Sequence, residues 1–192
     1  MQNNSFEYLK EEDYKVAITN RIFETYLYDL FYLNETKNSR LADAAVVERN
    51  QFISGHYLDM DKVLERFQAH YTSYYGEKDW EFLEEDGRFL FLTFLKPIIN
   101  GTGHYYVDAG TRDQRRTDII VDYHGKQYII ELKIWHGEEY QVKGRKQLCD
   151  YLDSYEQNKG WLVSFCFNKA KEKKTGIKKI NEAGKIITEV VI

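Results

Sequence analysis

The chain has 192 residues, of which 43% are hydrophobic and 16% aromatic, and its formal net charge is −4. This composition indicates one well-packed core with an added segment, and it excludes a disordered chain. The small negative charge excludes a globally basic surface, so any contact with nucleic acid would come from local lysine and arginine clusters. The N-terminus is polar and acidic, without the pattern of a secretory signal, and no run of apolar residues reaches the length of a membrane span. We therefore expect a cytoplasmic protein with no membrane segment, in which Cys149 and Cys166 are buried free thiols.

Residues 1 to 75 are predicted to be a mostly helical segment. Apolar residues recur at three- and four-residue intervals from Asp13 to Leu33, which is typical of one face of an amphipathic helix. A second pattern of this kind runs from Met60 to Tyr71, with Asp59 or Asp61 available as the N-cap.

A third helix is predicted from Trp80 to Leu95. We expect Pro97 to end it, because the residue before a proline is disfavoured in the α conformation. The joint between the helical segment and a second domain, residues 76 to 192, is placed near residues 72 to 78.

The second half of the chain alternates strand and helix patterns. We expect a strand at His104–Asp108, a hairpin at Arg116–Trp135, a helix at Glu138–Tyr155 and strands at Trp161–Phe167 and Lys185–Ile192. The buried face of the helix is predicted to hold Tyr140, Gln147, Leu148, Tyr151, Leu152 and Tyr155. A strand that returns after a crossover helix makes a mixed β-sheet flanked by helices, so the predicted class is α/β.

The hairpin has a register that its own sequence specifies. A turn at His124-Gly125 would pair Tyr123 with Lys126, Val121 with Tyr128 and Ile119 with Ile130. A shift of one residue would destroy this apolar pairing. In the same register, Asp118 lies opposite Glu131.

Two carboxylates opposite each other on adjacent strands repel unless something neutralises them. Lys133, two positions along from Glu131, is one candidate, and a divalent cation between the carboxylates is another. Hard oxygen ligands suit Mg²⁺ or Mn²⁺ better than zinc. Such a centre would act on a phosphodiester, with Lys133 orienting or helping to deprotonate a water and Gln147 reaching the same water or phosphate. The alternative is an ordinary Glu-x-Lys pair on a half-exposed strand.

These residues resemble the motif of the PD-(D/E)xK nuclease superfamily. More closely, the residues from about Asp13 to the C-terminus resemble the C-terminal portion of bacterial AAA-ATPase-like proteins that carry such a domain. The similarity lies in FLEEDGR at 82 to 88, LKPIINGTG at 95 to 103, TR at 111 to 112, RTD at 116 to 118, IELKIWHG at 130 to 137 and KQLCDYLD at 146 to 153.

The resemblance implies a restriction-endonuclease-like core, a metal site at Asp118 and Glu131, a catalytic Lys133 and an auxiliary Gln147. It also implies a glutamate from the first core helix, for which Glu84 and Glu85 are both available and Glu85 is favoured. Thr117 stands where the superfamily motif has a proline. The sequence contains no Gly-x-x-x-x-Gly-Lys-Ser/Thr loop, so we do not expect this chain to bind ATP.

Several basic and histidine side chains flank the predicted site in sequence. Six of them have two interpretations: they form a rim that binds phosphate, or they belong to an ordinary solvated surface. These residues are Arg112, Arg115, Arg116, Lys143, Arg145 and Lys146. His136 is interpreted as a polar residue at a strand end, and the lysines from Lys169 to Lys179 as a solvated face.

Two functional hypotheses follow. The first is a metal-dependent nuclease acting on DNA rather than RNA through Asp118, Glu131, Lys133, Gln147 and Glu85. The second is an inactive nuclease-fold module that binds a partner or regulates an associated ATPase. Pairing of the two carboxylates with Lys133 and Arg116, with no room left for a cation, would favour the second.

Overall fold

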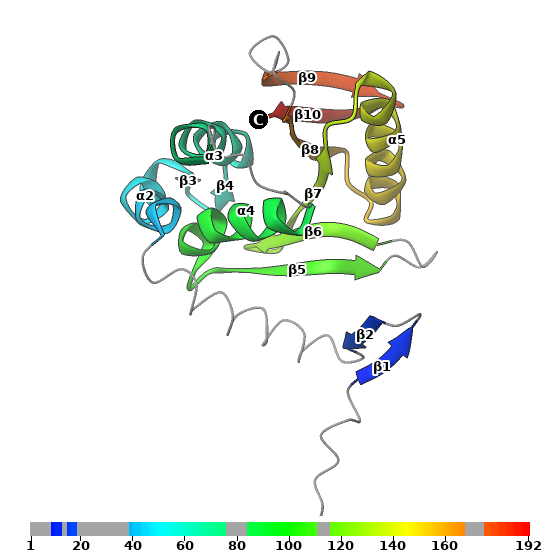
Figure 1. Ribbon diagram of the computed structural model, residues 1–192. Helices are drawn as coiled ribbons and strands as arrows, with labels where there is room; N and C mark the ends of the chain where they lie inside the picture. The colour runs from blue at the N-terminus through cyan, green and yellow to red at the C-terminus, as the bar shows by residue number, and fades with distance from the viewer. Residues whose placement is uncertain (1–8, 13–14, 19–38, 76–83, 111–115, 168–174) are drawn as a thin grey trace, which may run out of the picture. The chain divides into compact units, whose positions relative to one another are not determined.

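The computed structural model of the protein describes residues 9–12, 15–18, 39–75, 84–110, 116–167 and 175–192 (Figure 1). The chain divides into two compact units, Met1–Asn38 and Ser39–Ile192. In the first unit, β1 (Leu9–Glu12) pairs antiparallel with β2 (Lys15–Ile18). The helix predicted from Asp13 is therefore wrong at residues 15 to 18, where the β-branched Val16 and Ile18 favour an extended backbone. The rest of that predicted helix lies outside the described residues.

The second unit is built around a mixed sheet. Its described elements are α2 (Arg40–Glu48), a 3₁₀ turn (Arg49–Gln51), β3 (Ile53–Ser54), β4 (Tyr57–Leu58), α3 (Met60–Tyr75), α4 (Glu84–Ile99), β5 (Gly103–Gly110), β6 (Arg116–Tyr123), β7 (Lys126–Ile134), α5 (Glu138–Ser154), β8 (Lys159–Phe165), β9 (Gly176–Glu182) and β10 (Lys185–Val191). Six of the described strands form one sheet in the order β5-β6-β7-β8-β10-β9. β8 is parallel to both β7 and β10, and the other neighbours are antiparallel. The predicted α/β class is confirmed, and the element order is compatible with the nuclease-like core that the resemblance implies.

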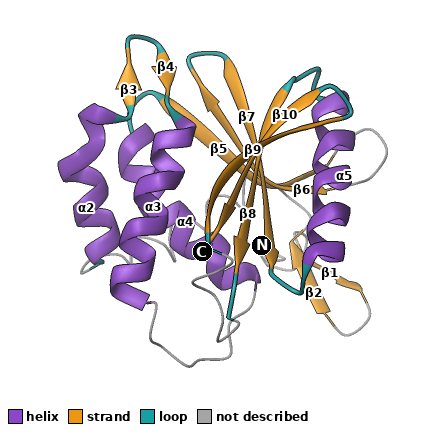
Figure 2. Cartoon of the chain, turned by 90° about the horizontal axis from the view of Figure 1, so that it is seen from above, coloured by secondary structure: helices purple, strands orange, loops and turns teal. Residues whose placement is uncertain are grey.

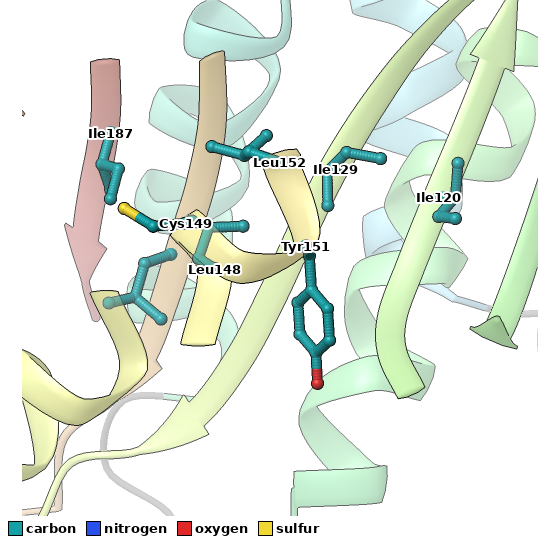
Figure 3. Close-up of a cluster of buried hydrophobic side chains, with 8 residues drawn as sticks. Ile120, Ile129, Leu148, Cys149, Tyr151, Leu152 and Ile187 are labelled. Atoms are coloured by element: carbon teal, nitrogen blue, oxygen red, sulfur yellow. The ribbon is translucent and has the colours of Figure 1, made fainter. Parts of the chain in front are cut away.

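Helices cover both faces of the sheet, as Figure 2 shows, with α5 on one side and α2, α3 and α4 on the other. On the α5 side, a cluster of buried side chains joins the helix to four strands (Figure 3). Its members are Ile120, Ile129, Leu148, Cys149, Tyr151, Leu152, Leu162 and Ile187. Each fully buried side chain of this size contributes about 1.5–3 kcal/mol to folding, so the cluster fixes α5 firmly across the strands.

On the opposite face, aromatic rings pack α3 and α4 against β8. Phe67 and Tyr71 lie against the Phe165 ring, with ring centroids 6.4 and 5.4 Å apart. Gly87 of α4 also meets that ring, because a Cβ built there would lie 2.3 Å from Phe165 Cε2. α3 therefore belongs to the same unit as the sheet, whereas the sequence placed the joint at residues 72 to 78.

The predicted helix start at Met60 is confirmed, with Asp59 as its cap. The Lys62 N–H donates to Asp59 Oδ1 at 3.2 Å. The predicted end of α4 before Pro97 is wrong, because the helix continues to Ile99. A proline in a helix interior costs about 3 kcal/mol, but burying Ile98 and Ile99 beyond it contributes a comparable amount.

β9 is the strand of the six-stranded sheet that the sequence pattern did not predict. It lies at the edge of the sheet, and most of its residues are exposed. Because β9 is exposed and rich in lysine, its sequence lacks the alternation of apolar and polar residues by which a strand is predicted. Both cysteines are buried free thiols, as predicted. No described helix is long and apolar enough to cross a membrane.

Candidate metal centre

The predicted hairpin register is confirmed, and it brings Asp118 and Glu131 to adjacent strands. Tyr123 pairs with Lys126 and Ile119 with Ile130, around a turn in which His124 and Gly125 have φ of 51° and 72°. Asp118 and Glu131 are the next residue along each strand. Because side chains alternate between faces, both share the α5 face with Ile120 and Ile129. Asp118 Oδ2 accepts a hydrogen bond from the Leu132 N–H at 2.7 Å.

Lys133 lies at the centre of the predicted site. Its Nζ is 2.7 Å from Glu131 Oε1, 3.2 Å from Glu84 Oε1 and 4.0 Å from Asp118 Oδ2. Glu84 comes from the first turn of α4, so the first core helix supplies a third carboxylate. The resemblance left Glu84 and Glu85 as alternatives and favoured Glu85. The structure brings Glu84 to the lysine, while Glu85 is exposed.

The Glu131 carboxylate is almost completely buried, with the residue 1% exposed. Lys133 and the backbone of Asp118 lie beside it, yet neither Glu131 oxygen has a well-aligned hydrogen bond within the described part of the chain. A buried carboxylate without such bonds is costly in its ionised form. Burial, reinforced by the Asp118 charge, raises the pKa of Glu131 to about 8.

The pKa values of the other two central groups are raised as well. For Asp118 the main cause is burial, with Lys133, the Leu132 N–H and Arg88 acting in the opposite direction. For Lys133, burial alone would lower the pKa, but the attraction of Glu131 and Asp118 outweighs it. Lys133 therefore stays protonated at neutral pH, which suits an electrostatic role better than that of a base.

Arg88 is a site residue that sequence reasoning missed. It lies one helical turn after Glu84 on α4, is 8% exposed, and its Nη2 is 4.0 Å from Asp118 Oδ1. Three carboxylates thus face two cations at the site. The spacing of four residues within FLEEDGR is the signal that would have linked Arg88 to Glu84.

Gln147 stands beside the buried face of α5, as predicted. Its Nε2 donates to the Tyr151 hydroxyl at 2.7 Å. Burial raises the pKa of Tyr151, and the charges of Glu131, Lys133 and Asp118 also act on it, which places the phenol close to the centre. Figure 3 shows this phenol pointing away from the apolar cluster. The sequence placed Tyr151 in the core and missed its second role.

A layer of buried polar groups lies beneath the first half of α5. Ser164, which pairs with Lys133 in the sheet, donates its hydroxyl to Gln141 Oε1 at 2.8 Å. Arg145 Nη1 lies 2.6 Å from Glu189 Oε1, and Glu189 is fully buried. Arg145 therefore does not belong to the predicted phosphate rim. Tyr140, predicted on the buried face, is 54% exposed, because these polar residues occupy that face instead.

The other basic residues of the predicted phosphate rim and of the lysine-rich segment are described in part. Arg112 and Arg115 lie outside the described residues, and Lys143 and Lys146 are exposed on α5. In the lysine-rich segment, two side chains are paired with acids: Lys178 lies 2.8 Å from Glu189, and Lys179 lies 2.9 Å from Asp61.

The donor set at the centre consists of carboxylate oxygens, which fits Mg²⁺ or Mn²⁺ in kind. Within the described ranges, no group of three or more His, Cys, Asp or Glu side chains is arranged to hold a metal ion, and the Lys133 ammonium lies among the carboxylates instead. Neither the protein-family models nor the curated proteins compared with the sequence gave a match.

Proposed function

We propose that the second unit is a metal-dependent, nuclease-like domain that hydrolyses phosphodiester bonds in DNA, acting in the cytoplasm. The observation that carries the proposal is the Glu131 carboxylate, buried without a well-aligned hydrogen bond beside Asp118 and Lys133. A buried carboxylate of this kind is costly in its ionised form, and a divalent cation would add positive charge to that of Lys133 beside it. The resemblance to the PD-(D/E)xK superfamily agrees with this chemistry.

In this proposal Asp118, Glu131 and Glu84 hold Mg²⁺ or Mn²⁺. When bound, the cation polarises the phosphodiester and stabilises negative charge on the leaving oxygen. The permanently charged Lys133 attracts a phosphate oxygen and orients the attacking water. That water would form the new bond to phosphorus and lose its proton to solvent, while the bond to the leaving sugar oxygen breaks and this oxygen takes up a proton from solvent. Gln147, held by Tyr151, adds an amide that can bind the same water or phosphate.

The test is direct. Purified protein is titrated with Mg²⁺ and Mn²⁺ by calorimetry and then incubated with single-stranded and duplex DNA and with RNA. We expect one cation to bind per chain and DNA to be cut only when that cation is present. Cation binding without cleavage of any nucleic acid would overturn the proposal.

A second candidate function is supported by the same lysine. Because Nζ lies within 4.0 Å of all three carboxylates, it attracts each of them without a metal, and Arg88 adds a second positive charge beside Asp118. In that case the domain is an inactive scaffold that binds a partner or regulates an associated ATPase domain or protein. Absence of cation binding, together with an unchanged fold in EDTA, would favour this function.

The two glutamates of α4 give a matched comparison. Glu84→Gln is expected to weaken Mn²⁺ binding by about tenfold or more, because it removes one anionic ligand near the centre. Glu85→Gln changes the same chemistry on an exposed side chain and should leave the affinity within about twofold. Calorimetric titration distinguishes them. The reverse order would assign the role to Glu85 instead.

Cation binding is expected to depend on pH through Glu131. Because burial raises the pKa of this group to about 8, a cation must displace a proton from it at neutral pH. The apparent affinity should rise by about tenfold per pH unit from pH 6 towards pH 8 and then level off. The same shift means that stability contributed by neutral Glu131 is lost as pH rises through its folded pKa. A flat affinity between pH 6 and pH 8, measured with Glu131→Gln as the reference, would contradict the assignment.

A further inference from the structure

An exposed group of one aromatic ring, one imidazole and one ammonium lies at the start of α5. Tyr140 is 54% exposed, and Lys143 Nζ lies 5.3 Å from its ring centroid. The His136 ring is also a neighbour of the Tyr140 ring, with the two centroids 5.2 Å apart. These three residues are called the α5 entry group below.

The α5 entry group is aligned with the candidate centre. With 3.6 residues per turn, Tyr140, Lys143, Gln147 and Tyr151 fall on one flank of the helix. The Tyr151 end of this flank lies close to Glu131 and Asp118, whose charges act on its phenol. From Gln147 to Tyr140 the helix rises by about 10 Å, which corresponds to about three nucleotides of stacked strand. One line of side chains thus leads from the centre to the surface.

Resting on the proposed function, we propose that the α5 entry group binds an unpaired segment of nucleic acid that leads into the centre. A base stacks on the Tyr140 ring, and Lys143 holds a neighbouring phosphate. An exposed aromatic ring beside a cation is the combination that binds single strands without reading sequence. In a duplex, by contrast, the faces of the bases are covered by their neighbours, so the ring selects a single strand or a frayed end.

Glu138, in the same turn, is directed away from this path. Glu138 Oε1 lies 3.5 Å from Arg145 Nη1, so this carboxylate is drawn towards the buried pair of Arg145 and Glu189 on the other flank. Tyr140 and Lys143 are left with their exposed surfaces on the flank that carries Gln147.

The experiment measures binding apart from cleavage. Fluorescence anisotropy with a labelled single-stranded DNA oligonucleotide in EDTA at low salt is compared for the full chain and its variants. Tyr140→Ala is expected to weaken binding by about tenfold, and Lys143→Ala to reduce the dependence on salt, with the log–log slope falling by about 0.7. Tyr57→Ala is the matched control, because Tyr57 is 55% exposed beneath Lys126 Nζ at 3.7 Å and lies beside the far end of the hairpin. It should bind as the parent does.

Each outcome decides the proposal. Loss of affinity in Tyr140→Ala with an unchanged Tyr57→Ala, and tighter binding of single strand than of duplex, supports it. Four results would overturn it. The two tyrosine variants lose affinity equally, Tyr140→Ala loses none, the parent binds duplex as tightly as single strand, or the parent does not bind at all. Cation binding and cleavage, measured separately, then show whether the proposed nuclease function fails with it or stands alone.

Discussion

Lys133→Ala is expected to abolish DNA cleavage while the domain stays folded. The ammonium is the charged donor at the middle of the centre, 2.7 Å from Glu131 and 3.2 Å from Glu84. Removing one preorganised electrostatic group of this kind typically lowers kcat by about 10²- to 10³-fold. The fold survives because Glu131, whose pKa burial raises to about 8, takes up a proton instead of remaining as an unpaired buried charge.

Two further variants make this result specific. Lys133→Met keeps the aliphatic stem, whose Cγ would lie 3.7 Å from a Cβ at Gly144, so it removes the charge with little change in packing. Lys126→Ala removes an exposed lysine from the same strand and should cut as the parent does. Cleavage products are followed on gels in Mg²⁺ and in Mn²⁺, and circular dichroism checks the fold. Full activity in Lys133→Met would remove the lysine from the mechanism and with it the central part of the proposal.

The hairpin was predictable because its information is local. Ile119, Val121, Tyr128 and Ile130 permit only one register, and a His-Gly turn accepts the positive φ that this register needs. From that register, the proximity of Asp118, Glu131 and Lys133 follows without knowledge of the rest of the chain. Gln147 was predictable for a similar reason, since helical periodicity alone places it beside the buried stripe.

The helix contributions to the centre were not predictable in the same way. Glu84 and Glu85 differ by about 100° around α4, and the choice depends on how Gly87 meets Phe165 on a distant strand. Gln141 and Arg145 look like surface residues in sequence. They are buried because Ser164 and Glu189, more than 20 residues away, provide their partners. Tertiary contacts of this kind override local pattern, and they explain why Tyr140 was placed on the wrong face.

Asp61→Ala is expected to lower the free energy of unfolding by about 3 kcal/mol, because it leaves buried donors unpaired. Asp61 Oδ1 accepts hydrogen bonds from Trp161 Nε1 at 2.7 Å and Thr188 Oγ1 at 3.1 Å, and Oδ2 lies 2.9 Å from Lys159 Nζ. Trp161 is 4% exposed and Thr188 is fully buried, so water cannot replace the lost acceptor at low cost. The carboxylate thereby joins the start of α3 to β8 and β10.

The charge of Asp61 should add a dependence on pH. Burial by itself would raise the pKa of Asp61. Hydrogen bonds from Lys179, Lys159 and Trp161 outweigh this effect and hold the pKa of Asp61 well below its usual range. A lowered pKa means that the stabilisation is present above the unfolded value, near pH 4, and is lost as pH falls further. Urea unfolding of the parent should therefore show a larger loss of stability in acid than Asp61→Ala and Asp61→Asn, which keep the share that comes from Glu48 and its lowered pKa.

Asp61→Asn separates the acceptor from the charge. Its amide oxygen can still accept from Trp161 and Thr188, so we expect a loss of only about 1 kcal/mol at pH 7, from the exposed lysine pairs. Asp59→Ala, which removes the α3 cap two residues earlier, should cost about 1 kcal/mol at pH 7. If Asp61→Ala is no less stable than Asp61→Asn, the buried donors have other partners. The join between α3 and the sheet would then rest on the rings of Phe67, Tyr71 and Phe165 and on the hydrogen bond from Gln68 Nε2 to the Val191 carbonyl at 2.6 Å.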